Sequence, residues 1–243
     1  SAILRARETS TGVAGDHNED NVAKISLFDL DRTLTHQPTY TALLVFMAWH
    51  SARWRLLLAP VVVATMLTYL AKLVSRRRLK EIEQALLVGK ALPKANADEL
   101  AEKFADRLEA GGFIEDGKKQ IAAERAQGRR VIMATAANGF YVEALARRLG
   151  INEVVCTRSC WQGDVITAAI EGDNCYGEAK REMVESYLES QGLARADIHV
   201  RFFSDHVSDK PTFEWSDEPI AVNPSPKLRV LAEQRCWPVL RWT

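Results

Sequence analysis

The chain has 243 residues, of which 47% are hydrophobic, enough for a folded core, so global disorder is excluded. Lys and Arg number 32, as do Asp and Glu, so the chain lacks the basic excess of a nucleic-acid-binding protein. Four cysteines are too few for a disulfide scaffold and are typical of reduced thiols. We therefore expect a cytoplasmic protein with one large domain, or a domain plus an insert, and no nucleic-acid partner.

The first elements are a tail and a short strand. Residues 1–20 are polar and irregular, which predicts a flexible tail and no signal peptide. Residues 24–29 include Ile25, Leu27 and Phe28 in a short apolar run, which predicts a buried strand. Acidic residues follow the run directly.

A long helical segment comes next. Between Thr35 and Gly128 apolar residues recur at helical spacing and strand signals vanish, which predicts five helices. Ser75 is the expected N-cap of the third helix. Because a strand precedes this segment and strands follow it, we expect residues 36–117 to form a helical cap domain inserted into another domain.

One apolar run in the insert is unusual. Residues 56–71, LLLAPVVVATMLTYLA, carry no charge and are interrupted by Pro60. The run is shorter than the roughly 18–20 residues of a membrane-spanning helix. Basic residues flank it on both sides: Arg53, Arg55, Lys72 and Arg76 to Arg78. We expect a helix buried in the insert, and a helix in contact with a membrane surface or lipid tails is the alternative.

After Gly128 strands and helices alternate. Strands are predicted at 130–135, 153–157, 198–205 and 219–222, with helices between them and hairpin-like sequence after the second. Alternation of this kind is typical of a parallel sheet with helices on both faces. The expected fold class is α/β: a doubly wound, three-layer, Rossmann-like core formed by residues 21–35 and 118–243, with an inserted all-helical cap domain.

Chemically active side chains follow several of these strands. In an open α/β sheet, ligands bind beyond the carboxyl ends of the strands. The residues expected there are Asp29, Asp31, Thr135, Asp205 and Asp209, with Lys180 near the start of a helix. Four carboxylates in one place repel one another and need a cation, and ligands that are all oxygen suit Mg²⁺.

The residue types also suggest roles. Asp29 and Asp31 lie two apart, so on a strand their side chains face the same side, and one could attack phosphorus while the other carries a proton. Thr135 can bind a phosphoryl oxygen, and we expect the Ala136 N–H to open toward a helix start as an anion site. Lys180 can neutralise nucleophile and phosphate. Asp209 is a metal ligand, a supporting anchor or a helix cap.

This ordered set resembles the haloacid dehalogenase superfamily. Its four motifs correspond to FDLDRTLT, VIMATAA, Lys180 in GEAKREM, and FSDHVSD. The insert after the first motif resembles the cap of the phosphoserine-phosphatase-like branch, subfamily IB. The resemblance implies that Asp29 forms an aspartyl-phosphate and that Asp31 is the general acid/base. It also implies that Mg²⁺ binds an Asp29 oxygen, the Asp31 backbone carbonyl and Asp205.

The sequence departs from the family pattern at two places. Arg32 stands where the family usually has glycine; it either points away or adds charge for a second anionic group of the substrate. In the second motif, Asn138 contacts substrate or caps the next helix. His36 contacts substrate or simply starts a helix.

The sequence is compatible with three functions. The first is a Mg²⁺-dependent phosphatase acting on a small phosphorylated metabolite. The second is a phosphatase acting on a lipid phosphate similar to phosphatidylglycerophosphate, with the cap in peripheral contact with a membrane. The third is a catalytically idle relative that binds a ligand or partner. The sequence leaves the oligomeric state open.

Overall fold

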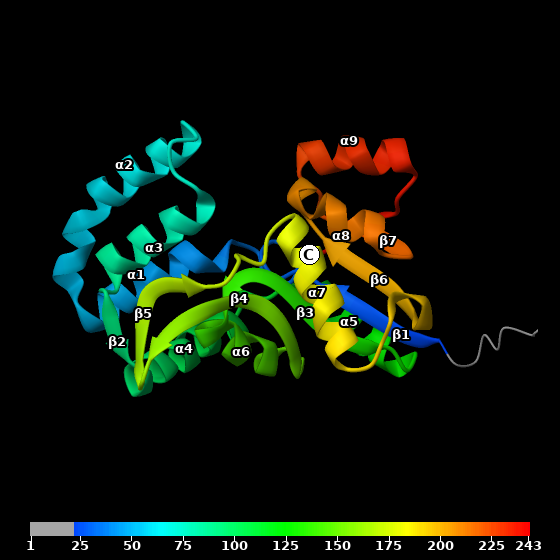
Figure 1. Ribbon diagram of the computed structural model, residues 1–243, viewed down its shortest axis with the longest axis horizontal. Coiled ribbons are helices and arrows are strands. Elements are labelled where there is room, and N and C mark those ends of the chain that lie inside the picture. The colour runs from blue at the N-terminus through cyan, green and yellow to red at the C-terminus, as the bar shows by residue number, and fades with distance from the viewer. Residues whose placement is uncertain (1–21) are drawn as a thin grey trace, which may run out of the picture.

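The computed structural model describes residues 22–243, so the tail expected at 1–20 lies outside the described residues. In the described part, eight strands form one sheet in the order β2-β5-β4-β3-β1-β6-β7-β8 (Figure 1). The strands are β1 (Ala23–Phe28), β2 (Ala91–Pro93), β3 (Arg130–Asn138), β4 (Glu153–Gln162), β5 (Val165–Glu171), β6 (Ile198–Ser204), β7 (Glu218–Val222) and β8 (Val239–Leu240). The six strands from β4 to β8 in this order are parallel, and β5 and β2 add an antiparallel edge.

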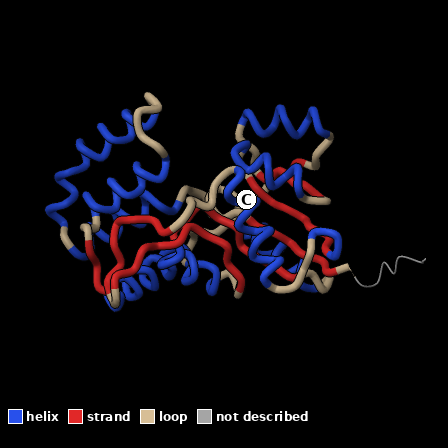
Figure 2. Tube along the Cα trace, in the orientation of Figure 1, coloured by secondary structure: helices blue, strands red, loops and turns tan. Residues whose placement is uncertain are grey.

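Helices cover both faces of the sheet (Figure 2). The helices are α1 (Thr39–Ser51), α2 (Ala59–Leu70), α3 (Arg76–Leu87), α4 (Lys94–Glu109), α5 (Glu115–Ala126), α6 (Gly139–Arg148), α7 (Glu178–Ser190), α8 (Lys210–Trp215) and α9 (Pro226–Arg235). Short 3₁₀ turns occupy Arg53–Leu58, Arg195–Asp197 and Val207–Asp209.

The central strand β1 shows how the layers are held together. Ile25 and Leu27 are fully buried in one apolar cluster with α7, α8 and α9. Phe28 points to the opposite side and joins a second cluster, which includes α5, α6 and the insert. Alternating side chains of one strand thus feed two cores, as expected for a strand covered on both faces. The doubly wound α/β fold is confirmed.

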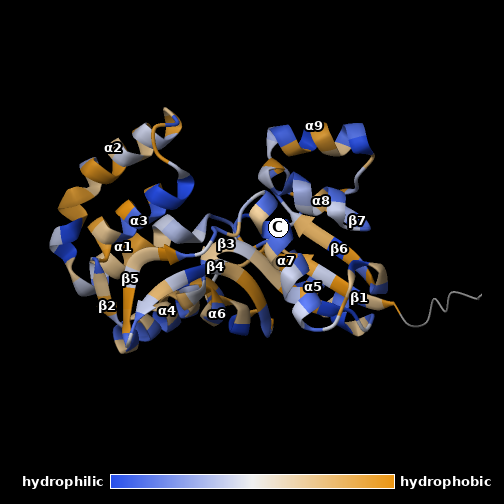
Figure 3. Cartoon of the chain, viewed as in Figure 1, coloured by the Kyte–Doolittle hydropathy of each residue, from blue (hydrophilic) through white to orange (hydrophobic). Residues whose placement is uncertain are grey.

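The insert contains α1 to α4 and packs on the second cluster, because buried residues such as Leu43 of α1 and Phe104 of α4 belong to it. Ser75 caps α3, since its hydroxyl accepts a hydrogen bond from the Arg78 N–H at 3.2 Å. The expectation that residues 56–71 are buried is wrong. In α2 only Val62 is buried, because the helix packs mainly against α3 and lies at the outside of the insert (Figure 3).

The expectation of an all-helical insert misses the strand β2. Its three residues pair antiparallel with β5, with Leu92 opposite Ile166 and both buried. Arg77 of α3 reinforces this attachment, because its guanidinium donates to the carbonyl oxygens of Ile170 and Gly172, each at 2.7 Å. A three-residue strand is too short to produce a recognisable period in the sequence. The domain boundaries at 36 and 117 stay a prediction.

Candidate active site

The end of β1 places the first two carboxylates. The Asp29 N–H donates to the Phe203 carbonyl at 2.9 Å, so β1 stays paired with β6 up to this residue. Leu30 is fully buried, and the chain then turns back, with the N–H groups of Leu34 and Thr35 bonded to the Leu30 carbonyl. Asp29 and Asp31 both line one cleft of about 210 Å³ at this edge of the sheet.

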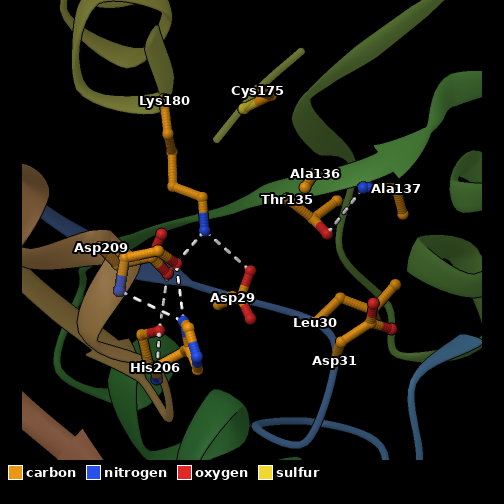
Figure 4. Close-up of polar contacts among 12 residues, drawn as sticks. Asp29, Leu30, Asp31, Thr135, Ala136, Ala137, Cys175, Lys180, His206 and Asp209 are labelled. Atoms are coloured by element: carbon orange, nitrogen blue, oxygen red, sulfur yellow. Dashed lines mark hydrogen bonds and ion pairs between the residues drawn. The ribbon is translucent and has the colours of Figure 1, made fainter. Parts of the chain in front are cut away.

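A lysine ties three elements together in this cleft. Lys180, in the first turn of α7, is 2% exposed. Its ammonium donates to Asp29 Oδ1 at 2.8 Å and to Asp209 Oδ2 at 2.7 Å (Figure 4). The Ser204 hydroxyl also donates to Asp209 Oδ2, at 2.7 Å. Asp209 therefore anchors the lysine; it occupies the N-cap position of α8 but makes no capping hydrogen bond.

Asp31 has different partners. Thr39, the first residue of α1, donates both its N–H and its hydroxyl to Asp31 Oδ1, each at 2.8 Å. The Thr39 hydroxyl also lies 3.0 Å from the Tyr141 hydroxyl. A helix N-terminus favours a carboxylate there. Among the described residues Oδ2 has no hydrogen-bond partner, so one oxygen of Asp31 is fixed and the other is available to carry a proton.

Burial makes the carboxyl groups of Asp29 and Asp205 costly to ionise. Burial raises the pKa of Asp29 to about 7, although the Lys180 ammonium opposes this shift. Burial, reinforced by the charges of Asp29 and Asp209, raises the pKa of Asp205 to about 8. Asp205 follows β6, is 6% exposed and lines the same cleft. A bound cation would favour the ionised form of both groups.

The donor set fits Mg²⁺. Asp209 Oδ1 is buried without a hydrogen-bond partner in the described structure, and the cleft also contains the carboxylates of Asp29, Asp31 and Asp205. Oxygen ligands of this kind are the ones that Mg²⁺ prefers. Within residues 22–243, no three His, Cys, Asp or Glu side chains form a complete metal cage. Mg²⁺ does not require such a cage, because it usually keeps several waters and binds through one or two carboxylates.

The second motif is only partly as expected. Thr135 and Ala136 line the cleft, but β3 continues to Asn138 and α6 begins three residues after Ala136. The expected helix-start anion site at the Ala136 N–H is therefore wrong, because the strand continues through a register shift after Thr135. The Thr135 hydroxyl accepts from the Ala137 N–H at 3.2 Å.

Two candidate substrate contacts lie outside the cleft. Asn138 is buried and its amide reaches Gln84 Oε1 at 3.4 Å; it precedes α6 without a side-chain capping bond, so neither expected role is supported. His36 is exposed, and it lines a separate groove beside α1 and α4. His36 lies two residues beyond the turn that follows Asp31, and it does not line the cleft that contains Asp31.

Arg32 does line the cleft, and its backbone is unusual. Its φ is +61°, in the left-handed region that glycine adopts easily and that costs other residues roughly 1–2 kcal/mol. The Arg32 charge lowers the pKa of Asp205, although burial dominates. The structure thus favours the interpretation that Arg32 adds positive charge to the site.

Sequence reasoning missed Arg76 and Tyr176. Both line the cleft, and the Arg76 guanidinium stacks over the Tyr176 ring at 4.2 Å. Arg76 comes from the insert and Tyr176 from the loop before α7, so no shared motif links them. The basic run at 76–78 was the available signal, but nothing in it distinguishes the first arginine from the next two.

A second chamber of about 290 Å³ adjoins the cleft and shares Asp31 and Arg76 with it. Its walls come mostly from the insert and include Tyr40, Met66, Tyr69, Leu70, Leu79, Lys80 and Glu83. Glu83 is 3% exposed, and its Oε1 has no hydrogen-bond partner in the described structure. Lys80 donates to the Ala136 carbonyl at 2.5 Å and to Asn174 Oδ1 at 2.8 Å, and burial lowers its pKa to about 7.

Two curated proteins are similar in sequence to part of the chain. The chain is 32% identical over 123 residues to a probable phosphatase of Mycobacterium tuberculosis, covering 51% of this chain and 42% of that protein. It is 26% identical over 156 residues to a phosphoserine phosphatase of the same organism, covering 64% and 49%. The chain thus spans about half the length of these curated relatives.

Solved structures support the fold. A protein of unknown function from Bordetella pertussis superposes with a TM-score of 0.83 at 27% identity, covering 90% of this chain and 98% of that one. A phosphoserine phosphatase with a phospho-aspartyl intermediate analogue has a TM-score of 0.60 at 18% identity, covering 90% and 93%, which shows the fold alone. Residues 26–214 match the protein family that is described as "haloacid dehalogenase-like hydrolase". That match runs from β1 through α8 and includes every strand end that lines the cleft, and the chain therefore belongs to the haloacid dehalogenase-like hydrolase family.

Proposed function

We propose that the protein is a Mg²⁺-dependent phosphomonoester hydrolase that works through an aspartyl-phosphate on Asp29. One observation carries the proposal: Lys180 bridges Asp29 and Asp209 in a cleft that Asp31 and Asp205 also line. Such a cluster of buried carboxylates around one lysine is poorly explained as a stabilising device, because burying unpaired charge is costly. Similarity to a probable phosphatase supports the same reaction class.

The proposal gives each side chain a task that its position supports. Lys180 holds Asp29 Oδ1, so Oδ2 is the oxygen that attacks phosphorus. The new bond joins Oδ2 to phosphorus while the bond from phosphorus to the ester oxygen breaks, and Asp31 gives that oxygen a proton. Asp31 then takes a proton from the water that attacks the aspartyl-phosphate. Phosphate leaves and the Asp29 carboxylate is restored.

Mg²⁺, when bound by Asp29, the Asp31 carbonyl and Asp205, would screen the negative charges of nucleophile and phosphate. The chain contributes Lys180 and Arg32 for the same purpose, and Arg76 closes the cleft from the insert side. Thr135 lies where a hydroxyl can contact a phosphoryl oxygen.

A phosphate-release assay with p-nitrophenyl phosphate tests this proposal. Turnover is expected with Mg²⁺ and not after removal of divalent cations. Asp29→Asn should lower turnover at least about 10³-fold, because it removes the nucleophile. Asp98→Asn is the matched control, since Asp98 is an exposed acid of α4 far from the cleft in the fold, and it should keep full turnover. Full turnover by Asp29→Asn would dispose of the nucleophile assignment, and no turnover at all would favour a catalytically idle binding protein.

The chamber beside the cleft bears on the substrate. Its apolar walls suit a leaving group with an apolar part, and the unpaired Glu83 oxygen suits a hydroxyl or amine on that group. A small phosphorylated metabolite with such a donor is our first candidate. A lipid-like phosphate is the second, because α2 contributes apolar residues both to the chamber and to the outer surface.

A screen of phosphorylated metabolites and phospholipid head groups separates the two candidates. In Glu83→Gln, KM should rise for substrates with a hydroxyl or amine near the phosphate. KM for p-nitrophenyl phosphate should stay the same. The four free cysteines fit our proposal of a cytoplasmic location.

A further inference from the structure

The outer surface of the insert is unusually apolar. In residues 22–243, fourteen large hydrophobic side chains are exposed, and ten of them lie between Val45 and Leu73. Five of these ten define what we call the outer cap face: Leu57, Val61, Val63, Leu67 and Leu73. Figure 3 shows the corresponding hydrophobic colouring of α2 at the edge of the molecule. A concentrated patch of this kind marks an interaction surface rather than ordinary surface hydrophobicity.

The charged residues in the stretch of chain that forms this face are all positive. Residues 32–80 contain no Asp or Glu and eight Lys or Arg, although the whole chain has no net charge. Arg53 and Lys72 lie exposed at the two ends of the apolar run. The first acid beyond it, Glu81, is already paired with Arg77 and Arg78. The surface that fits this face therefore has an apolar interior covered by negatively charged groups.

Two exposed tryptophans lie at one end of the same surface. Trp49 and Trp54 are 51% and 60% exposed, and Arg53 stacks on the Trp49 ring at 4.5 Å. An aromatic ring with a polar edge, beside a basic residue, suits the boundary between lipid tails and head groups. A second copy of the chain fits poorly, because a symmetric contact through this face would bring like charges together.

The attachment of α2 decides between lying on a membrane and crossing it. The segment Arg53–Leu70 is, by length and composition, the one described helical stretch that could span a bilayer. Its inner side is fastened to α3, however: Val62 is buried, and Arg55 Nη1 donates to the carbonyl oxygens of Ala85 and Leu86 at 3.2 and 2.9 Å. Spanning would break these contacts and bring arginine into the hydrocarbon, which is costly.

We propose that the outer cap face docks peripherally on an anionic lipid bilayer, with α2 lying along the surface. The inner side of α2 lines the chamber that shares Asp31 with the phosphate cleft, so docking brings the cleft close to the head groups. The proposal concerns binding alone and does not depend on the proposed catalytic activity.

Co-sedimentation with vesicles tests the proposal without any turnover measurement. The full chain is expected to sediment with vesicles of phosphatidylcholine mixed with phosphatidylglycerol, and much less with phosphatidylcholine alone. The double variant Leu57→Glu/Leu67→Glu should bind at least about tenfold more weakly, because each change removes a large buried apolar contact with lipid. Val230→Glu, on α9, is the matched control: Val230 is 53% exposed and Leu67 is 59% exposed, and this variant should bind like the parent.

Four outcomes would overturn the proposal. One is no sedimentation with either vesicle. Another is equal binding by parent and double variant. A third is release by detergent but not by high salt or alkaline carbonate, which would show a spanning helix. The last is a dimer in sedimentation equilibrium that the double variant abolishes while vesicle binding is absent, which would assign the face to a second copy. Unchanged p-nitrophenyl phosphate turnover, or an unchanged unfolding midpoint if there is none, shows that the variants are folded.

Discussion

The cleft at the carboxyl ends of the strands and the outer cap face depart in opposite ways from the usual rule that charged residues are exposed and apolar residues are buried. At the sheet edge, Asp29, Lys180 and Asp209 are charged and almost completely buried. On the outer cap face, side chains such as Leu57 and Leu67 are apolar and largely exposed. Folding alone favours neither arrangement, because buried charge and exposed apolar surface both cost free energy. This shared cost is the physical reason why we propose a substrate for the cleft and a lipid surface for the outer cap face.

The largest effect is expected from removing the positive charge at the sheet edge. Lys180→Met leaves two buried carboxylates without their partner and should lower the free energy of unfolding by about 3–5 kcal/mol. Urea unfolding measures the change. Adding Asp209→Asn should recover part of the stability, because it removes one of the stranded charges. If Lys180→Met were as stable as the parent, the two regions would not differ as described.

The next test compares a buried leucine of the insert with an exposed one. Leu43 is fully buried in α1, and Leu43→Ala should cost about 2–5 kcal/mol of unfolding free energy. Leu67 is 59% exposed, and Leu67→Ala should change it by less than about 0.5 kcal/mol. Chemical denaturation without lipid gives both values. A large cost for Leu67→Ala would mean that the outer cap face is covered in solution.

Lys80 provides a pH test of buried charge in the insert. Its pKa in the folded protein is lowered from 10.5 to about 7, so between these pH values the unfolded chain binds more protons than the folded one. The free energy of unfolding should therefore rise with pH in this window, by up to about 2 kcal/mol from pH 7 to pH 9. Lys80→Met should lack this rise when both proteins are unfolded at the two pH values. A parallel pH dependence in the two would contradict the lowered pKa.

The smallest effect is expected at Arg32. Arg32→Gly and Arg32→Ala both remove the charge and should raise KM a few-fold for substrates with a second anionic group, since exposed ion pairs contribute about 0.2–1 kcal/mol. Only glycine relieves the positive φ, so Arg32→Gly should be more stable than Arg32→Ala by about 1 kcal/mol. Steady-state kinetics and thermal unfolding separate charge from backbone. Unchanged KM in both would leave Arg32 without a role in binding.

The core of the site could be predicted from the sequence because its residues follow strands. Asp29 and Asp31 follow β1, and Asp205 follows β6. The carboxyl ends of parallel strands lie on one side of the sheet whatever the order of the strands is. Lys180 could be placed because it starts the helix that leads back to the sheet. The order of strands and helices along the chain was sufficient for this part.

The residues contributed by the insert could not be predicted in the same way. Arg76 and Glu83 reach the cleft and chamber through the packing of α3 on its neighbours, which no local pattern specifies. The apolar run of α2 predicts a helix equally well whether it is buried or exposed, and only the tertiary arrangement shows that it is exposed. His36 was a candidate for substrate contact because it is close to Asp31 in sequence, but a turn separates the two residues and His36 lines a separate groove.

The strand β2 has a consequence for how molecules enter and leave. Because Leu92 pairs with Ile166 and Arg77 holds the end of β5, the insert and the β4–β5 hairpin are joined as one body. A movement of the insert alone would first have to break the pairing of β2 with β5 and the hydrogen bonds of Arg77. Substrates therefore reach Asp29 either past the stacked side chains of Arg76 and Tyr176, which line the cleft, or by a movement of the hairpin together with the insert.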